Sequence, residues 1–177
     1  EKAVPLMSGK KLLPVSILIP TMNRPKALKR TIDCYLKGQY IPSQIVVVDQ
    51  SEHGVDRDSI RQLVEEYSLD TEMVYIYQDI PSLTKARNTA YKYAKQEIII
   101  YSDDDIDVYD DTIKNIHILM QNPGLALIAG IDDNTKHSSS KIGYLLGTKS
   151  FHNRKIGHVT SSMLGRFPNE IEEVTDT

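Results

Sequence analysis

Three adjacent aspartates, Asp103 to Asp105, are the residues in this sequence best suited to chemistry. One residue, Ser102, separates them from the apolar run 97–101 (EIIIY), which has the character of a buried strand. Like charges this close repel each other, so folding disfavours them unless something offsets the repulsion. A hard divalent cation would do so, because Mg²⁺ is held by one or two carboxylates together with phosphate oxygens and water. A calcium loop of the EF-hand type is excluded, since Val108 and Lys114 stand where that loop needs Gly and Glu.

Other polar residues outside this triplet could bind a ligand. Asp49 follows the β-branched run 45–48 and could either cap the next turn or accept a hydrogen bond from a base or sugar. Arg24, in the TMNRP turn, could be a surface charge or a phosphate partner. Lys85 and Arg87 open a helix, where positive charge opposes the helix dipole. A bound anion would explain this pair, and a solvated helix face is the alternative.

The chain must fold so that these distant residues meet. Apolar, β-branched runs predict strands over 15–19, 45–48, 73–77, 98–101 and 125–129. Helical spacing predicts a helix from Pro25 that stops at Gly38, one capped by Asp58, one over 83–94 and one capped by Asp111. This alternation predicts an α/β fold, with a mostly parallel sheet covered by helices on both faces. Ligands bind such sheets outside the carboxyl ends of the strands, where the polar clusters should converge.

Composition narrows the class of protein. A length of 177 residues suits one domain, and we expect a tail over 1–13 followed by a single domain over 14–177. A hydrophobic content of 40% is enough for a core, and a net charge of -3 without a basic stripe argues against a nucleic-acid partner. One cysteine, Cys34, excludes an internal disulfide, and the apolar runs are too short for a membrane helix.

Three stretches, in this order, carry a family resemblance: VSILIPTMNRP, QIVVVDQS and SLTKARNTAYKYAKQEIIIYSDDDI. Each motif alone is weak, but the ordered set is specific, and it resembles the family-2 glycosyltransferases from about residue 15 to residue 129. The resemblance implies the GT-A fold, a Rossmann-like α/β architecture. Its Pro-Thr-x-Asn motif matches Pro20, Thr21 and Asn23.

The resemblance also implies roles for individual residues. A strand-end aspartate such as Asp49 would contact the nucleotide base, and the aspartate motif would bind ribose and a Mg²⁺ or Mn²⁺ ion on the diphosphate. The expected metal ligands are Asp103, Asp104 and Asp105, with Asp104 or Asp105 as the principal ligand. The expected contacts to the nucleotide sugar are Pro20, Thr21, Asn23, Arg24, Asp49, Ser51, Lys85, Arg87, Asp103 and Asp104.

The sequence departs from the family pattern at two points. Gln50 follows Asp49, where the family often has a second acid. The catalytic base of the family lies well beyond the aspartate motif, usually in an acidic pair after a Gly-rich segment. We find no such pair before Thr177, so we expect the base to lie beyond that residue and leave the catalytic residue unassigned.

The resulting hypothesis is a metal-dependent, inverting glycosyltransferase of glycan or cell-surface polysaccharide synthesis. Its donor would be a UDP, dTDP or GDP sugar and its acceptor a glycan or lipid-linked hydroxyl. We expect it in the cytoplasm, with peripheral attachment to the inner face of a membrane left open. Two alternatives come from other classes. One is a nucleotide-sugar-binding module without turnover. The other is a receiver-like signalling domain, for which Lys136 is a poor match to the required lysine.

Overall fold

A parallel β-sheet forms the centre of residues 9–124, the part of the chain that the computed structural model describes. Its strand order is β3-β2-β1-β4, and each neighbouring pair is parallel. The strands are β1 (Lys11–Thr21), β2 (Tyr40–Asp49), β3 (Glu72–Tyr77) and β4 (Ile98–Tyr101). The helices are α1 (Pro25–Lys37), α2 (Val55–Tyr67), α3 (Leu83–Tyr91) and α4 (Thr112–Leu119).

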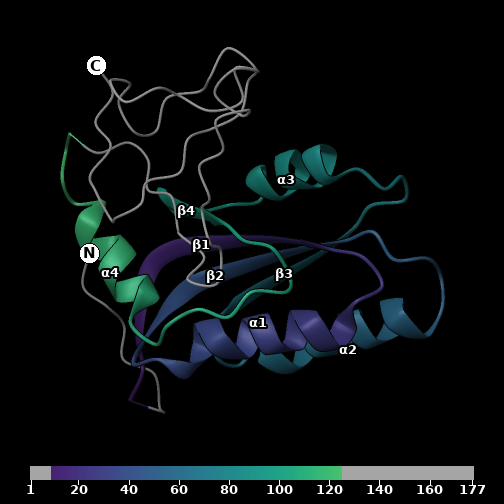
Figure 1. Cartoon of the computed structure of the whole chain (residues 1–177), viewed down its shortest axis with the longest axis horizontal. Helices are drawn as coiled ribbons and strands as arrows, with labels where there is room; N and C mark the ends of the chain where they lie inside the picture. The colour runs from purple at the N-terminus through teal and green to yellow at the C-terminus, as the bar shows by residue number, and fades with distance from the viewer. Residues whose placement is uncertain (1–8, 125–177) are drawn as a thin grey trace, which may run out of the picture. The chain divides into compact units, whose positions relative to one another are not determined.

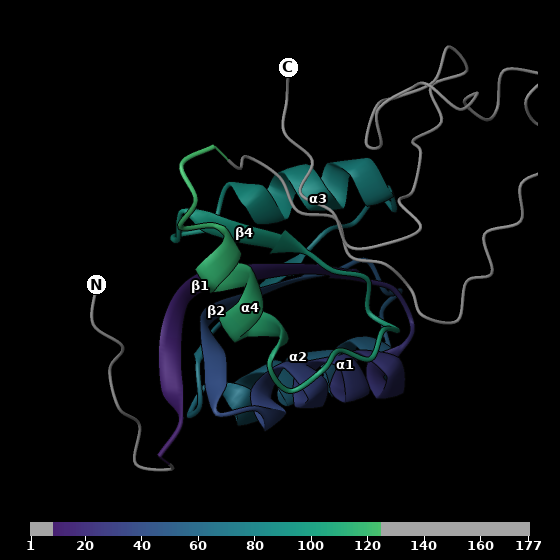
Figure 2. The same cartoon turned by 60° about the vertical axis from the view of Figure 1, so that its left-hand side comes forward.

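The helices cover both faces of this sheet. Figure 1 shows α1 and α2 on one face and α3 on the other. The short helix α4 contacts β1 and β2, and Figure 2 shows it beside the end of the sheet where these strands begin. The predicted α/β class, with a mostly parallel sheet between layers of helices, is therefore confirmed. No helix within residues 9–124 is long and apolar enough to cross a membrane.

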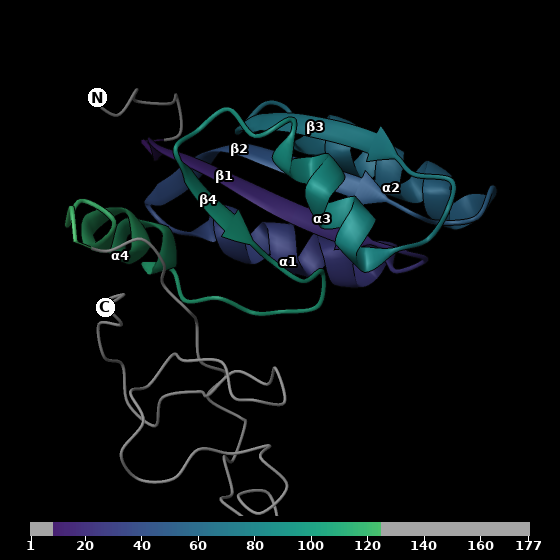
Figure 3. The same cartoon turned by 90° about the horizontal axis from the view of Figure 1, so that it is seen from above.

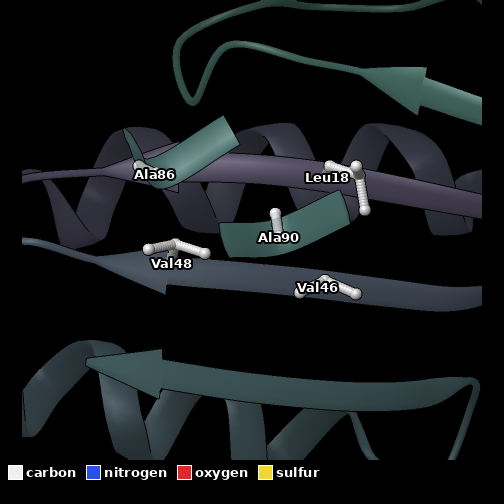
Figure 4. Close-up of a cluster of buried hydrophobic side chains, with 5 residues drawn as sticks. All are labelled: Leu18, Val46, Val48, Ala86 and Ala90. Carbon is white, nitrogen blue, oxygen red and sulfur yellow. The ribbon is translucent and has the colours of Figure 1, made fainter. Parts of the chain in front are cut away.

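The core forms because the strands are β-branched on both faces. In β2, for example, Ile45, Val46, Val47 and Val48 are all fully buried. Small residues let α3 lie close to the sheet. Its Ala86 and Ala90 pack in one cluster with Leu18, Val46 and Val48, and Figure 4 shows these five side chains between α3 and strands β1 and β2. Close helix-to-sheet packing thereby fixes the position of α3 and of the basic residues at its start.

A buried amide ties the sheet together well before the strands end. Gln44 in β2 is fully buried. Its Oε1 accepts hydrogen bonds from Ser16 Oγ at 2.7 Å and from the Lys95 backbone N–H at 3.0 Å. Its Nε2 donates to the Tyr93 carbonyl at 3.1 Å. One side chain therefore satisfies polar groups of β1 and of the segment that joins α3 to β4.

The first strand is longer than predicted. β1 begins at Lys11, so residues 11–13 belong to the sheet rather than to the predicted tail. These residues pair with the start of β2, where Lys11 lies opposite Tyr40. The sequence hid this pairing because Pro14 interrupts the first strand, and the register shifts around it between Leu13 and Ser16.

Two helix boundaries also differ from prediction. The second helix begins at Val55, and Asp58 lies inside its first turn, where its N–H bonds to the Gly54 carbonyl. The prediction that Asp58 caps this helix is therefore wrong. Its negative charge near the start of the helix still stabilises the helix through the helix dipole. The third helix ends at Tyr91 rather than at Ala94. The predicted strand over 125–129 lies outside the described residues.

The chain divides into two units, Glu1–Leu119 and Met120–Thr177. The described strands and helices all belong to the first unit. The predicted single domain over 14–177 stays a prediction.

Candidate active site

Neighbouring strands end together at one edge of the sheet. β1 ends at Thr21 and β2 at Asp49, and these two residues are register partners. On the other side of β1, the Leu18 carbonyl accepts from Ser102 N–H at 3.0 Å, just after β4 ends. The backbone nitrogen of Pro20, two residues on, faces the same side but lies past the end of β4. Its missing N–H therefore costs no sheet hydrogen bond.

Asp104 is a buried acid at this edge. Its residue is only 1% exposed, and its Oδ2 accepts a hydrogen bond from Thr21 Oγ1 at 2.6 Å. Burial raises the pKa of Asp104 above its ordinary value, while the Thr21 hydrogen bond and the charge of Arg24 act in the opposite direction. A carboxylate held this way is costly to bury without a cation beside it.

Two arginines supply positive charge that offsets the repulsion among the three aspartates. Arg24 places Nη2 at 2.8 Å from Asp104 Oδ1 and Nη1 at 2.9 Å from Asp105 Oδ2. Arg87, on the first turns of α3, places Nη2 at 3.0 Å from Asp103 Oδ1. The repulsion within the triplet is therefore offset by protein groups in this structure. These pairs also account for the basic residue that opposes the dipole of α3.

The donor chemistry of the triplet fits a hard cation, but its geometry is open. Asp104 Oδ1 is buried and accepts no directed hydrogen bond within residues 9–124, although the Arg24 charge lies beside it. Among those residues, no group of three or more His, Cys, Asp or Glu side chains is gathered closely enough to hold a metal ion. Mg²⁺ needs only one or two carboxylates when phosphates complete its shell. Asp104 and Asp105, which both contact Arg24, supply the two carboxylates that such an ion needs. Asp103 contacts Arg87 instead.

Both carboxylate oxygens of Asp49 already accept hydrogen bonds from the protein. It is 0% exposed, its Oδ1 accepts from Ser51 N–H at 2.8 Å, and its Oδ2 accepts from the Tyr75 hydroxyl at 2.8 Å. Burial, followed by the hydrogen bond to Asp49, raises the pKa of Tyr75 above its ordinary value. The strand-end aspartate thus shapes the loop after β2, and its predicted contact with a base stays a prediction.

Asn23 joins the loop after β1 to the loop after β2. Its N–H donates to Ser51 Oγ at 2.8 Å, and its Oδ1 accepts from Glu52 N–H at 3.3 Å. Its φ of 56° lies in the left-handed region, which asparagine tolerates better than most residues. Beside it lies an open cavity of about 260 Å³, lined by Asn23 and residues 52–56. The turn predicted to bind a nucleotide sugar therefore borders a cavity.

A glutamine pair holds the opening of α3. Gln50 Oε1 accepts from Ser82 N–H at 2.6 Å and from Gln78 Nε2 at 3.1 Å, and both glutamines are buried. Ser82 caps α3 by accepting from Lys85 N–H at 3.3 Å. Among residues 9–124, no carboxylate pairs with the Lys85 ammonium. Gln50 thus does structural work where the family often has an acid.

The segment after the aspartates is fastened along α1. Thr31 Oγ1 donates to the Ile106 carbonyl at 2.9 Å, and Arg30 Nη2 donates to the Asp105 carbonyl at 3.2 Å. Further along, Gly38 lies so close to Asp110 that an added Cβ would be 2.1 Å from its carbonyl oxygen. Figure 3 shows this segment leaving β4 and running beside α1 to α4. The acidic residues therefore sit on a backbone held by α1.

A family comparison decides what this arrangement belongs to. The model of glycosyl transferase family 2 matches residues 16–164, most of the chain and all of the site described above. The chain belongs to glycosyl transferase family 2. A comparison with curated protein sequences gave no match.

Solved structures agree with this family 2 fold. S. aureus TarS is 24% identical, with a TM-score of 0.54 over 62% of this chain and 20% of that one. TarS 1–349 in complex with UDP-GlcNAc is 21% identical, with a TM-score of 0.55 over 72% and 38% of the two chains. Mannosyltransferase PcManGT from Pyrobaculum calidifontis, in complex with GDP-Man and Mn2+, is 21% identical, with a TM-score of 0.55 over 70% and 36%. This chain thus spans well under half the length of these proteins, and the likeness confirms the GT-A fold.

Sequence reasoning named most of the residues that gather at the strand ends, but it missed several side chains that hold them in place. Tyr75, Gln78, Arg30 and Thr31 were not singled out, because each acts through a partner far away in the chain. Tyr75 had one usable signal. It lies two register positions before the partner of Asp49 on β3, so both side chains point to the same face of the sheet.

Proposed function

We propose that this family 2 chain binds a nucleotide-diphosphate sugar at the strand ends and transfers the sugar to an acceptor hydroxyl. The observation that carries the proposal is the buried Asp104 carboxylate at the carboxyl edge of a family 2 sheet, where Asp104 and Asp105 both pair with the guanidinium of Arg24. Binding outside the carboxyl ends of the strands is the rule for open α/β sheets. Solved structures of the same fold bind UDP-GlcNAc and GDP-Man, which supports this donor class.

Different residues of the site would contact different parts of the donor. Asn23 lines the cavity beside the strand ends, where the nucleoside would lie, and the buried Ser51 holds it there by accepting a hydrogen bond from its N–H. Arg24 and Arg87, both about half exposed, can turn from the aspartates toward the diphosphate. Lys85 adds positive charge at the same end of α3. The nucleotide itself, whether UDP, dTDP or GDP, is left for the binding experiment below.

Asp104 and Asp105 would hold a Mg²⁺ or Mn²⁺ ion, with Asp103 close by on the same loop. When bound, such an ion stabilises the negative charge that develops on the departing nucleotide diphosphate. Thr21 orients Asp104 for this task through its hydroxyl group. A structurally similar mannosyltransferase was solved with Mn2+, which supports a divalent ion here.

The finer features of the proposal concern the acceptor. A glycan or lipid-linked hydroxyl would attack the anomeric carbon from the face opposite the leaving group, so the sugar configuration would invert. A carboxylate base would take the hydroxyl proton. We propose that the reaction belongs to glycan or cell-surface polysaccharide synthesis in the cytoplasm, with peripheral attachment to the inner face of a membrane left open. An NMR assignment of the anomeric configuration in donor and product tests the inversion.

Calorimetry tests the donor site directly. We expect UDP, dTDP or GDP to bind the chain more tightly with Mn²⁺ than without it. Asp104→Asn should weaken the Mn²⁺-dependent binding at least about tenfold, because it removes a charge that the cation needs. Asp58→Asn, an exposed change in α2, is the matched control and should bind like the original chain. Equal affinity in both variants would refute the assignment, and binding without any sugar transfer to acceptors would indicate a binding module.

A further inference from the structure

Arg24 occupies the oxygens that a metal ion would need. Its two terminal nitrogens lie 2.8 Å from Asp104 Oδ1 and 2.9 Å from Asp105 Oδ2. The second oxygen of Asp104 is already taken, because it accepts the hydroxyl of Thr21. Oδ1 is therefore the atom through which Asp104 can meet a cation, and a guanidinium now stands there. A metal ion and Arg24 cannot both take that position.

The placement of Arg24 makes it able to leave. Arg24 is the residue just before α1, and its side chain makes no capping hydrogen bond to that helix. The side chain is 52% exposed, whereas Asp104 is buried beneath it. The turn itself is held by Asn23 and Ser51 through backbone and side-chain bonds that do not involve the guanidinium. Swinging Arg24 outward therefore breaks the ion pairs and leaves the turn in place.

The charges of the site favour exchange over simple addition. Three carboxylates of the triplet face two guanidinium groups, from Arg24 and Arg87. A divalent ion added to these groups without an anion would leave a net positive charge beside both arginines. A diphosphate that arrives with the ion removes that excess and offers the released guanidinium a bidentate partner.

We propose that Arg24 is an internal counterion that competes with the metal ion for Asp104 and Asp105 and is released onto the diphosphate. This inference rests on the proposed function and deepens it by specifying how the site is regulated. Metal alone binds weakly, because it must displace the guanidinium. Metal and nucleotide diphosphate bind together, because each removes the cost that the other would meet. The free chain thus keeps its acids paired until a donor arrives.

The test measures Mn²⁺ binding by calorimetry, with and without saturating UDP. Arg24→Gln should bind Mn²⁺ alone about tenfold more tightly than the original chain, because the competing state is gone. The gain in Mn²⁺ affinity on adding UDP should shrink in the same variant. Arg61→Gln, which removes one positive charge from an exposed pair with Glu65, is the control and should leave both affinities unchanged. Arg24→Lys, which keeps the charge but loses the fork, should fall between the two.

Each outcome separates this inference from the proposed function. If Arg24→Gln binds Mn²⁺ alone no better than the original chain while UDP and Mn²⁺ still bind together, the competition is overturned and the donor site stands. If UDP binds equally well without Mn²⁺, Arg24 is itself the cation of the site and the competition is again overturned. If UDP, dTDP and GDP all fail to bind the original chain under any condition, the proposed function falls first. A urea unfolding curve of Arg24→Gln that matches the original confirms that the variant is folded.

Discussion

Tyr75→Phe should destabilise the chain by removing the side-chain hydroxyl that donates a hydrogen bond to the buried carboxylate of Asp49. Asp49 is 0% exposed, and the Tyr75 hydroxyl donates to its Oδ2 at 2.8 Å. A buried acceptor left without its donor costs about 1–3 kcal/mol, and charged acceptors lie toward the upper end. Tyr75 is half-buried, so water can partly replace the hydroxyl. We therefore expect a loss of about 2 kcal/mol in the free energy of unfolding.

Urea unfolding followed by circular dichroism measures this loss. With a slope of about 2 kcal/mol/M, the midpoint should fall by about 1 M. Tyr77→Phe is a close control, because it removes the same group two residues on, where the partner is the exposed Asp79 at 3.2 Å. That variant should stay within about 0.5 kcal/mol of the original chain. Equal small effects from both variants would refute the reasoning that Asp49 depends on Tyr75.

The pH dependence gives a second reading of the same bond. The pKa of Tyr75 is raised in the folded chain, so the unfolded chain releases the hydroxyl proton first as the pH rises. The contribution of this group to stability is complete below about pH 10 and is lost as the pH passes through the raised folded value. The original chain should therefore lose stability above about pH 10 more steeply than Tyr75→Phe does. Urea curves of both chains, recorded below and above that pH, measure the difference.

Three further predictions concern the residues around the acids. Gly38→Ala should cost about 1–3 kcal/mol in urea unfolding, because the new Cβ would meet the Asp110 carbonyl oxygen at 2.1 Å; unchanged stability would contradict the close approach. Gln50→Leu should lose about 2 kcal/mol by leaving the Ser82 N–H unpaired, while Gln50→Glu keeps the acceptor and should lose less; the reverse order would argue against this role. Because burial raises the pKa of Asp104, its contribution to stability should decline as the pH rises from about 4 through the raised value, and urea curves of Asp104→Asn should lack that decline.

The sheet was predictable because its strands announce themselves locally. β4 was predicted from Ile98 to Tyr101, as the structure has it, since a run of isoleucines between polar segments has few other readings. β1 was cut short because Pro14 reads as a break, although the sheet absorbs it by a shift in register. The start of α2 was misplaced because Gly54, which precedes the helix, gives no capping signal of its own.

The site was predictable as a location more than as a set of contacts. Strand ends in a parallel sheet converge by topology, so Thr21, Asp49 and Asp104 could be placed near one another from sequence. Their partners could not. Arg24 and Asp105 are 81 residues apart in the chain, and no local pattern indicates that their side chains meet. A metal was the simplest answer to the acidic repulsion when only the sequence was considered, and arginine is the answer within the described residues.

The buried Gln44 has a consequence for how this site is assembled. Side chains alternate between the two faces of a strand, so sliding β2 by one residue would turn Asp49 away from its partners and displace it by about 3.3 Å. The same slip would pull Gln44 from Ser16 and from the backbone of residues 93 and 95, and leave an amide without partners in an apolar layer. Mispaired sheets are thus penalised at a place remote from the ligand. One glutamine in the middle of the sheet thus favours the strand register on which the positions of the acids at its edge depend.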